Sequence, residues 1–419
     1  MNKYRNTMAA CYVGYIVQAV VNNLLPLLFV IFKEHFGIST QKLGSLILIN
    51  FVMQLFIDLA ASRFGDKLGY RRALVLAHLC AGLGLILAGV LPIILPSAYL
   101  GLILATFFYA IGGGLIEVMV SPMMDAMPSD NKSAAMSLLH SFYCWGQVAV
   151  VLLSTVFIKL VGEQYWYILP VVWSLVPLFN VISFLRVPMP EMLAEEERVS
   201  LKELFRNKLF LCFVLLMISA GSSELAMSQW ASYFAEEGLG VSKFLGDLLG
   251  PCAFAVFMGI ARVIYGIFGS RIPLKKAMLL CALLCVGCYL LAGLSRNPYF
   301  ALLGCAVCGF SVGVMWPGTL SLAGAAFKGG TAMFGILALS GDIGCSIGPW
   351  LTGMVSGMVE HSERLSAFGD AFGWSAQQTG IKLGLLLAVV FPIITVFSLL
   401  GLKSAESQRE NLEKQGIVC

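Results

Sequence analysis

Charged residues are scarce in this 419-residue chain: 27 are basic and 23 are acidic, together 12% of the total. Histidine is rarer still, with four copies, whereas hydrophobic residues make up 59%. A soluble domain of this length needs far more charge to cover its surface, and one anchor or signal segment would not raise the mean hydropathy of the whole chain to +0.87. The composition therefore excludes a secreted, nucleic-acid-binding or disordered protein and predicts an integral membrane protein.

The 12 cysteines lack the neighbours that a metal or redox site requires. Two pairs, Cys285 with Cys288 and Cys305 with Cys308, have CxxC spacing, but they lie in apolar runs with no histidine or acidic residue nearby. Thiols in such runs are typical of reduced packing residues. We expect no metal and no cofactor. The N-terminal segment has no small-residue cleavage site, so we expect no removable signal either.

Long apolar runs recur along the whole chain. A helix needs about 20 apolar residues to cross roughly 30 Å of hydrocarbon. Charges and Pro/Gly interruptions divide the chain into twelve runs of that length. The predicted spans are 8–32, 44–64, 72–94, 98–125, 133–158, 165–185, 209–235, 245–269, 274–294, 298–326, 330–358 and 380–402. The sequence thus predicts an all-α membrane protein with twelve transmembrane helices.

Lysine and arginine are distributed unevenly between the loops. An even number of spans places both termini on one side, and 19 of the 27 basic residues fall on that side against 7 on the other. By the positive-inside rule, both termini are predicted to be cytoplasmic. Short loops and the lack of a targeting peptide favour a bacterial inner membrane.

The longest polar interruption separates the spans into two groups of six. It contains the acidic run Glu195, Glu196 and Glu197 beside several basic residues. This pattern predicts an amphipathic cytoplasmic linker, for which a merely solvated tether and a regulatory role are equal alternatives. The predicted units are a six-helix bundle at 1–186, the linker at 187–208, a second six-helix bundle at 209–402 and a cytoplasmic tail at 403–419.

A short charged loop occurs at the same place in each half. The loop between spans 2 and 3 contains Asp66 and a basic cluster, and the corresponding loop between spans 8 and 9 has Ser270 at the equivalent position, 204 residues later. A repeat of this period indicates two pseudo-symmetric bundles. Charge pairs at helix ends can latch such bundles until the halves rock, although the basic residues alone could simply mark the cytoplasmic face. The candidate gating residues are Asp66, Lys67, Gly69, Arg71, Arg72 and Arg271.

The first loop resembles the G-x-x-x-D-R/K-x-G-R/K-R/K signature of the major facilitator superfamily, with Ser62 in place of the leading glycine. In the second copy, Ser270 replaces the acid and Pro273 replaces the inner glycine. The resemblance implies a fold in which helices 1, 4, 7 and 10 line a central path, helices 2, 5, 8 and 11 flank it, and the others face outward. Spans 9 and 12, which are nearly free of polar side chains, agree with this arrangement.

Four acids lie within predicted spans, where an ionisable group is costly and is a functional candidate by default. They are Asp58, Glu117, Glu224 and Asp342. Asp58 lies within about two turns of the first charged loop and could serve the latch instead. We predict that Glu117, among apolar neighbours, takes up a coupling proton, with Asp342 and Glu224 as second choices.

Polar and aromatic side chains accompany these acids at helical spacing, such as Gln18 and Asn22 in span 1. Aromatic faces with amide groups are typical of sites for neutral, hydroxyl-rich ligands. Such residues can alternatively join helices by hydrogen bonds, and a tryptophan can anchor the membrane interface. The candidate solute-binding residues are Gln18, Asn22, Glu117, His140, Gln147, Glu224, Gln229, Trp230 and Trp316.

The glycine-rich stretch before Glu117 and the Glu224-x5-Trp230 pattern resemble the fucose permease group of sugar/proton symporters. Members of that group pair the helix 4 acid with an aspartate in helix 1, where this chain has Asn22 and Asn23. The resemblance implies proton-coupled sugar uptake, with sodium coupling or facilitated diffusion as alternatives. The antiporter glycine-proline motif belongs to helix 5, and span 5 lacks it.

The sequence therefore predicts a secondary transporter that moves a small polar solute, in the first instance a monosaccharide, by alternating access and proton symport. One alternative is an efflux antiporter for amphipathic compounds, which the 28 phenylalanines and 18 methionines would favour. Another is a membrane solute sensor without transport. No catalytic constellation is visible, so an enzyme is not expected. The expected partners are the solute, a proton or sodium ion and the lipid bilayer, with no nucleic acid, and the protein is expected to be a monomer.

Overall fold

The computed structural model describes residues 2–128, 132–190, 205–268, 273–326 and 331–414. Within those ranges the chain consists of helices and short connections, and no strand occurs there. For some helical residues, including Asp58, Asp66 and Lys67, the description covers the backbone only. The all-α prediction is confirmed for the described part of the chain.

The first six predicted spans form a bundle of long helices. Pro26 lies just before α1 ends, and spans 2 and 3 are one element that is kinked at Gly69, where φ is +72°. Only glycine adopts this φ without strain, which explains its place in so short a turn. The helices are α1 (Arg5–Leu27), α2 (Phe29–Phe36), α3 (Thr40–Ile94), α4 (Ala98–Ala126), α5 (Lys132–Val161), α6 (Ile168–Trp173) and α7 (Leu175–Arg186), with 3₁₀ turns at η1 (Asn2–Tyr4) and η2 (Glu163–Tyr165).

The remaining spans are interrupted more often. One-turn π-helices η3 (Phe234–Gly238) and η4 (Leu248–Cys252) follow α10 and α11, and α17 occupies a connection in which no helix was predicted. The helices are α9 (Lys208–Ser228), α10 (Ala231–Tyr233), α11 (Lys243–Asp247), α12 (Ala253–Phe268), α13 (Leu274–Leu294), α14 (Pro298–Val312), α15 (Met315–Ala326), α16 (Thr331–Glu360), α17 (Glu363–Asp370), α18 (Ala376–Ala388) and α19 (Val390–Lys414).

Eleven helical segments in the described residues are long and apolar enough to span a membrane. The remaining predicted span, 330–358, corresponds to α16, whose 30 residues extend about 45 Å. Its interior contains Asp342, several glycines and Pro349, which together lower its hydropathy. The residues that make α16 the least apolar span are therefore the same ones that make it a candidate for function.

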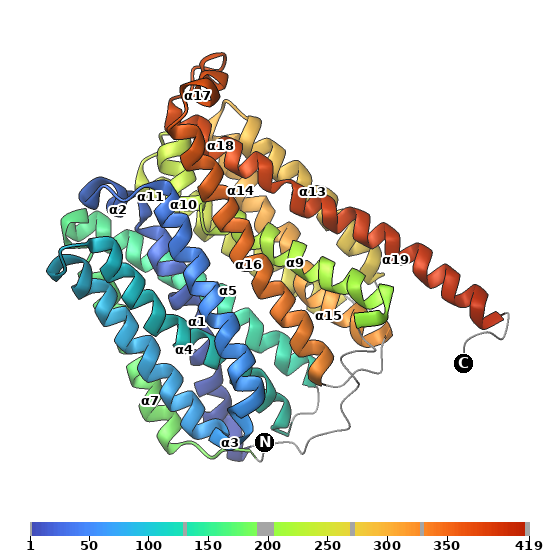
Figure 1. The fold of residues 1–419 in the computed structure, drawn as a ribbon. Coiled ribbons are helices and arrows are strands. Elements are labelled where there is room, and N and C mark those ends of the chain that lie inside the picture. The colour runs from blue at the N-terminus through green and yellow to red at the C-terminus, as the bar shows by residue number, and fades with distance from the viewer. Residues whose placement is uncertain (1, 129–131, 191–204, 269–272, 327–330, 415–419) are drawn as a thin grey trace.

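The two groups of six helices lie side by side, with α16 of the second packed along α3 of the first (Figure 1). We call the end of the molecule with α2 and α17 the distal end, and the end where α1 begins and α19 ends the proximal end (Figure 1). Among the described helices, five at the distal end carry a side-chain N-cap, which satisfies an otherwise free backbone N–H. The caps are Ser39 of α3, Ser97 of α4, Asn297 of α14, Ser362 of α17 and Ser375 of α18.

Candidate functional site

Glu117 of α4 lies at one end of a chain of amides. Gln18 of α1 donates from Nε2 to Glu117 Oε2 over 2.9 Å and to Gln54 Oε1 of α3 over 3.1 Å. A Cβ on Gly113 would lie 3.1 Å from Gln18 Oε1, and one on Gly112 would lie 2.6 Å from the α3 backbone. The glycine-rich stretch therefore brings α1, α3 and α4 together beside the carboxyl group.

The amide chain continues through two buried asparagines. Gln54 Nε2 donates to Asn22 Oδ1 over 2.9 Å and to Asn50 Oδ1 over 3.0 Å. Asn50 Nδ2 also donates to Asn22 Oδ1, over 3.1 Å. Sequence analysis selected Asn22 but missed Asn50 and Gln54, although their i, i+4 spacing within span 2 was a usable signal.

The same segment of α1 is where the second half makes its central contact. Gln229, just after α9, donates from Nε2 to the backbone carbonyl of Asn22 over 3.0 Å and lies 3.4 Å from Asn23 Oδ1. Two small spaces border Gln229, each large enough for about one water molecule. The predicted residues Gln18, Asn22, Glu117 and Gln229 are thus parts of one connected network.

A buried ion pair lies on the other side of this region. Arg262 of α12 reaches to within 3.9 Å of Glu224 Oε2 on α9. It also makes two long contacts, of 3.4 Å, to the carbonyls of Gly313 and His140, and a closer one, of 3.2 Å, to Cys144 Sγ. Arg262 is the one basic residue that lies within a predicted span, 245–269, and was counted on neither side, although a lone arginine at membrane depth is itself a signal.

Three of the four acids predicted within spans, Glu117, Glu224 and Asp342, lie at the interface between the halves, and the side chain of the fourth, Asp58, lies outside the described part of the protein. Glu117 and Asp342 are close enough to interact electrostatically, although they belong to α4 and α16. Glu224 interacts in the same way with Tyr143 of α5, which in turn accepts a hydrogen bond from Asn23 Nδ2 over 3.3 Å. Glu117 is partly exposed, whereas Asp342 is buried. Because their partners lie across the interface, these acids do not face lipid.

Three other predicted residues have distinct surroundings. The His140 ring packs edge-on against Tyr15 with 5.0 Å between centroids. Gln147 is buried on α5, and its Nε2 has no hydrogen-bond partner in the described part of the protein. Trp316, on α15, packs its indole over Gly341 of α16 and stays partly exposed.

Trp230 lies between the halves near the distal end, fully buried. Its Nε1 donates to the carbonyl of Pro349 over 2.9 Å, and its ring packs against Phe29 with 5.4 Å between centroids. A Cβ on Gly353 would lie 2.5 Å from the Trp230 ring and 3.1 Å from Gly44 Cα. Glycine at both positions lets α3 and α16 close around the indole.

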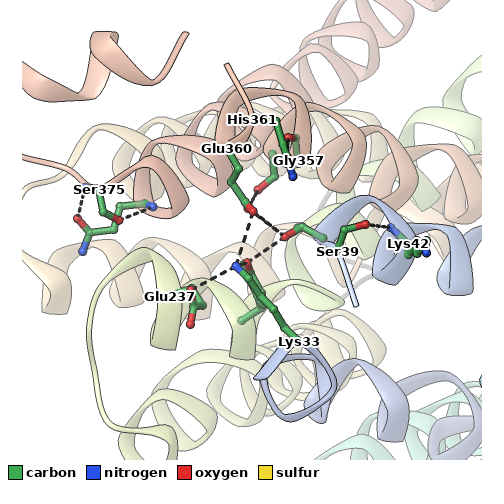
Figure 2. Close-up of polar contacts among 12 residues, drawn as sticks. Lys33, Ser39, Lys42, Glu237, Gly357, Glu360, His361 and Ser375 are labelled. Carbon is green, nitrogen blue, oxygen red and sulfur yellow. Dashed lines mark hydrogen bonds and ion pairs between the residues drawn. The ribbon is translucent and has the colours of Figure 1, made fainter. Parts of the chain in front are cut away.

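A second contact between the halves is ionic, and we call it the distal lysine cluster. Lys33 of α2 donates to Tyr233 Oη over 2.6 Å and forms ion pairs with Glu237 at 3.4 Å and Glu360 at 3.6 Å (Figure 2). Thr40 donates to Glu360 over 3.0 Å. Burial opposes the charged amine, but Tyr233 and the two carboxylates outweigh it and raise the pKa of Lys33.

A second lysine makes a similar link from the other half. Lys243 of α11 donates to the carbonyl of Leu27, at the C-terminus of α1, over 2.8 Å. It also pairs with Asp247 at 3.2 Å and Glu236 at 3.5 Å, and Asp247 accepts a hydrogen bond from Thr155 of α5 over 2.7 Å. Burial, and the nearby Asp247, raise the pKa of Glu236 to about 7 in spite of Lys243.

The predicted gating residues lie at the proximal end, and the structure describes only some of them. Arg71 donates to the carbonyls of Phe184 and Val187 over 2.8 and 2.9 Å, so it binds the end of α7 within the first half. Arg72 is exposed. Arg271 and the side chains of Asp66 and Lys67 lie outside the described residues.

The hydrogen bonds and ion pairs that join the halves, as far as the described residues give them, extend from Arg262 through Gln229 to the distal lysine cluster. The distal end is therefore closed by packed aromatic and ionic contacts. Polar side chains lie beneath this closure, between the two halves.

Comparison with known proteins agrees with this architecture. The family model of the Major Facilitator Superfamily matches residues 11–349. A bacterial homolog of the human lysosomal transporter Spinster, in an inward-facing and occupied conformation, shares 15% identity at a TM-score of 0.74 and covers 96% of this chain and 97% of its own. The D-xylose-proton symporter shares 13% identity at a TM-score of 0.71, covering 93% and 97%.

A variant of the E. coli fucose:proton symporter FucP shares 18% identity at a TM-score of 0.60, covering 94% of this chain and 99% of that one. No curated protein sequence matches the chain. At such identities the solved structures establish the fold alone, whereas the family model spans most of the sequence. The chain belongs to the major facilitator superfamily and is a multi-pass membrane transporter.

Proposed function

We propose that this protein is a proton-coupled symporter that moves a small polar solute, a monosaccharide in the first instance, by alternating access of its two halves. The observation that carries the proposal is the position of Glu117. Its carboxyl group lies within electrostatic range of Asp342 in the other half and joins, through Gln18 and Gln54, the network that Gln229 contacts from the second half. A proton taken up by Glu117 would therefore affect a network that involves both halves.

The solute would bind among groups that suit a sugar. The amides of Gln18, Asn22 and Gln147 can donate to and accept from hydroxyl groups, and the face of Trp316 suits the C–H side of a sugar ring. Arg262 and Glu224 add charged hydrogen-bonding groups on the opposite side. The unpartnered Nε2 of Gln147 is a donor that a hydroxyl of the solute would satisfy.

The proposal includes an orientation. The proximal end, with most of the basic residues, would face the cytoplasm of a bacterial cell and the distal end the outside. The six-helix units at 1–186 and 209–402 would rock about the central network, with the Asp66 loop and Arg271 as the proximal latch. The distal lysine cluster would then be the outer gate, closed in this structure.

The test is transport by purified protein in sealed liposomes. Radiolabelled fucose, xylose and galactose are the probes, and uptake is compared with and without an inward proton gradient. We expect the gradient to drive accumulation of at least one sugar. Glu117→Gln should abolish accumulation but keep sugar exchange, because a permanently neutral side chain can still reorient. Glu34→Gln, at an exposed acid of α2, is the matched control and should behave as wild type.

Two results would contradict the proposal. Unchanged gradient-driven accumulation in Glu117→Gln would exclude this residue as the coupling site. Failure of all three sugars, in protein that is correctly folded, would exclude the monosaccharide assignment.

A further inference from the structure

The side-chain amide of Gln18 has an orientation that is unfavourable for its own oxygen atom. Both hydrogen atoms of its Nε2 are used, one toward Glu117 and one toward Gln54, while its Oε1 is buried without a hydrogen-bond partner in the described part of the chain. An orphaned buried carbonyl is costly. A carboxylate explains the choice, because an ionised acid can only accept hydrogen bonds and so demands the donor side of the amide.

We propose that Gln18 and Gln54 form a reversible amide chain, which turns over when Glu117 gains a proton and so carries that event to the contact between Asn22 and Gln229. The inference rests on the proposed function, in which Glu117 is the coupling site. It assigns Gln18 and Gln54 as positioning residues for the coupling step.

The reversal follows from the donors and acceptors present. A protonated Glu117 has an O–H to donate, and Gln18 can receive it only by turning its Oε1 toward the acid. That turn would set the Gln18 carbonyl against Gln54 Oε1, now 3.1 Å from Gln18 Nε2, so Gln54 must turn as well and donate back. Only hydrogen bonds are exchanged, and the proton stays on the carboxyl group.

The effect at the far end is a change of partner. Once turned, Gln54 no longer donates to Asn22 Oδ1 or Asn50 Oδ1, at 2.9 and 3.0 Å in this structure, and it sets its own Oε1 against both oxygens, so that these contacts must lengthen. Asn22 then keeps a single side-chain donor from α3, Asn50 Nδ2. Because Gln229 holds the backbone of Asn22, the loosened asparagine weakens the central contact between the halves. The titratable groups that face Glu117 across the interface are Asp342 and Cys345 of α16.

The test is the pH dependence of sugar exchange in liposomes, measured from pH 5 to 9 with the sugar that the protein accumulates. Gln18→Met keeps the side-chain length but removes the donor to the ionised acid, so the pH midpoint should rise by about one unit. Gln54→Met, which touches no acid, should raise it by about half a unit, because Gln18 is then freer to turn. The double variant should shift no further than Gln18→Met, since Gln54 acts only through Gln18.

Asn180→Leu is the matched control. This substitution removes a buried amide from the same bundle, where Asn180 forms hydrogen bonds with the carbonyl of Ala10 and with His78 Nε2. Asn180 is not part of the amide chain of Gln18 and Gln54. Its thermal stability should fall while its pH midpoint stays at the wild-type value. If the methionine variants fold poorly, Gln18→Asn and Gln54→Asn are too short to bridge their neighbours and replace them in the same assay.

The outcomes separate the two ideas. If the pH midpoint shifts in Gln18→Met but not in Gln54→Met, the proposed amide chain is wrong, and Gln18 only forms a hydrogen bond with Glu117. No shift in either variant, while Glu117→Gln still loses accumulation, overturns the inference but not the proposed function. Normal accumulation in Glu117→Gln removes the basis of both.

Discussion

The distal lysine cluster makes the sharpest prediction, because one side chain holds three partners across the interface. Lys33→Met removes the amine while keeping most of the side chain's apolar volume. Its Nζ donates to Tyr233 Oη and pairs with Glu237 and Glu360, with a side-chain exposure of 21%. Thr40 would still bond Glu360 and Tyr233, so the contact is weakened and not abolished.

The magnitude follows from the exposure. Ion pairs that water can reach contribute about 0.5 kcal/mol each, and a hydrogen bond from a charged donor contributes about 2 kcal/mol. The variant should therefore destabilise the closed distal end by about 3 kcal/mol, which is about a 100-fold change in a two-state equilibrium. A protein that is about 99% closed would become about evenly divided between closed and open.

The assay is a distance measurement by pulsed electron spin resonance. Labels at Gln164 and Arg364 report on the distal end of each half, in a background without the accessible native cysteines. We expect Lys33→Met to add a second, longer distance. Lys42→Met is the matched control, since Lys42 lies over the Tyr99 ring of its own half at 5.3 Å. A single, wild-type distance in Lys33→Met would refute the reasoning, because the aromatic packing alone would then keep the end closed.

Three further predictions concern other contacts between or within the halves. Arg262→Met should lower the free energy of unfolding by about 3–5 kcal/mol, because it leaves Glu224 buried without its cation. Adding Glu224→Gln should recover most of the lost thermal stability. Equal melting temperatures for the single and double variants would contradict this. Gly353→Ala should prevent distal closure by overlapping the indole it packs against, as seen in the same distance measurement, whereas Gly287→Ala, with open space around its Cβ, should leave the distance unchanged. Since the pKa of Glu236 is raised to about 7, its ionisation opposes the folded, closed arrangement: the stabilising effect of the proton is complete below about pH 4.5 and is lost as pH rises through 7. Closure should therefore weaken between pH 5 and 8 in wild type, and the dependence should vanish in Glu236→Gln; a persisting dependence would assign the titration elsewhere.

Much of the fold could be predicted because the bilayer imposes strong rules on sequence. A helix must be apolar over about 20 residues, so span positions follow from composition, and even the glycine at the α3 kink lay within a recognisable loop motif. The two π-helical breaks are exceptions to this rule. The breaks at η3 and η4 have no apolar signature, because a π-turn is defined by the hydrogen bonding of the backbone and not by the apolar content of its residues.

The candidate site was predictable only in part. Glu117, Gln18 and Asn22 stood out because polar groups at membrane depth are rare and costly. The partners Lys33, Glu237 and Glu360 did not, because charges at helix ends are ordinary there and nothing in the sequence pairs residues more than 200 positions apart. Trp230 illustrates a third case: an aromatic residue in a span can bind a ligand, anchor the interface or, as in this structure, fill the contact between halves.

In the proposed transport cycle both main contacts between the halves break, and the chemistry of each contact suits its position. At the distal end, separating Lys33 from its carboxylates exposes every charge to water, which solvates them and keeps the cost of opening small. At the centre, the two spaces beside Gln229 hold only about one water molecule each, so a broken hydrogen bond there is replaced less easily and costs more of its desolvation penalty. A chain of amides avoids this penalty because Gln18 and Gln54 can donate or accept by turning, and they exchange partners where a fixed charge pair would lose them. Replacing the central amides with an ion pair should therefore slow reorientation far more than the same change at the distal end.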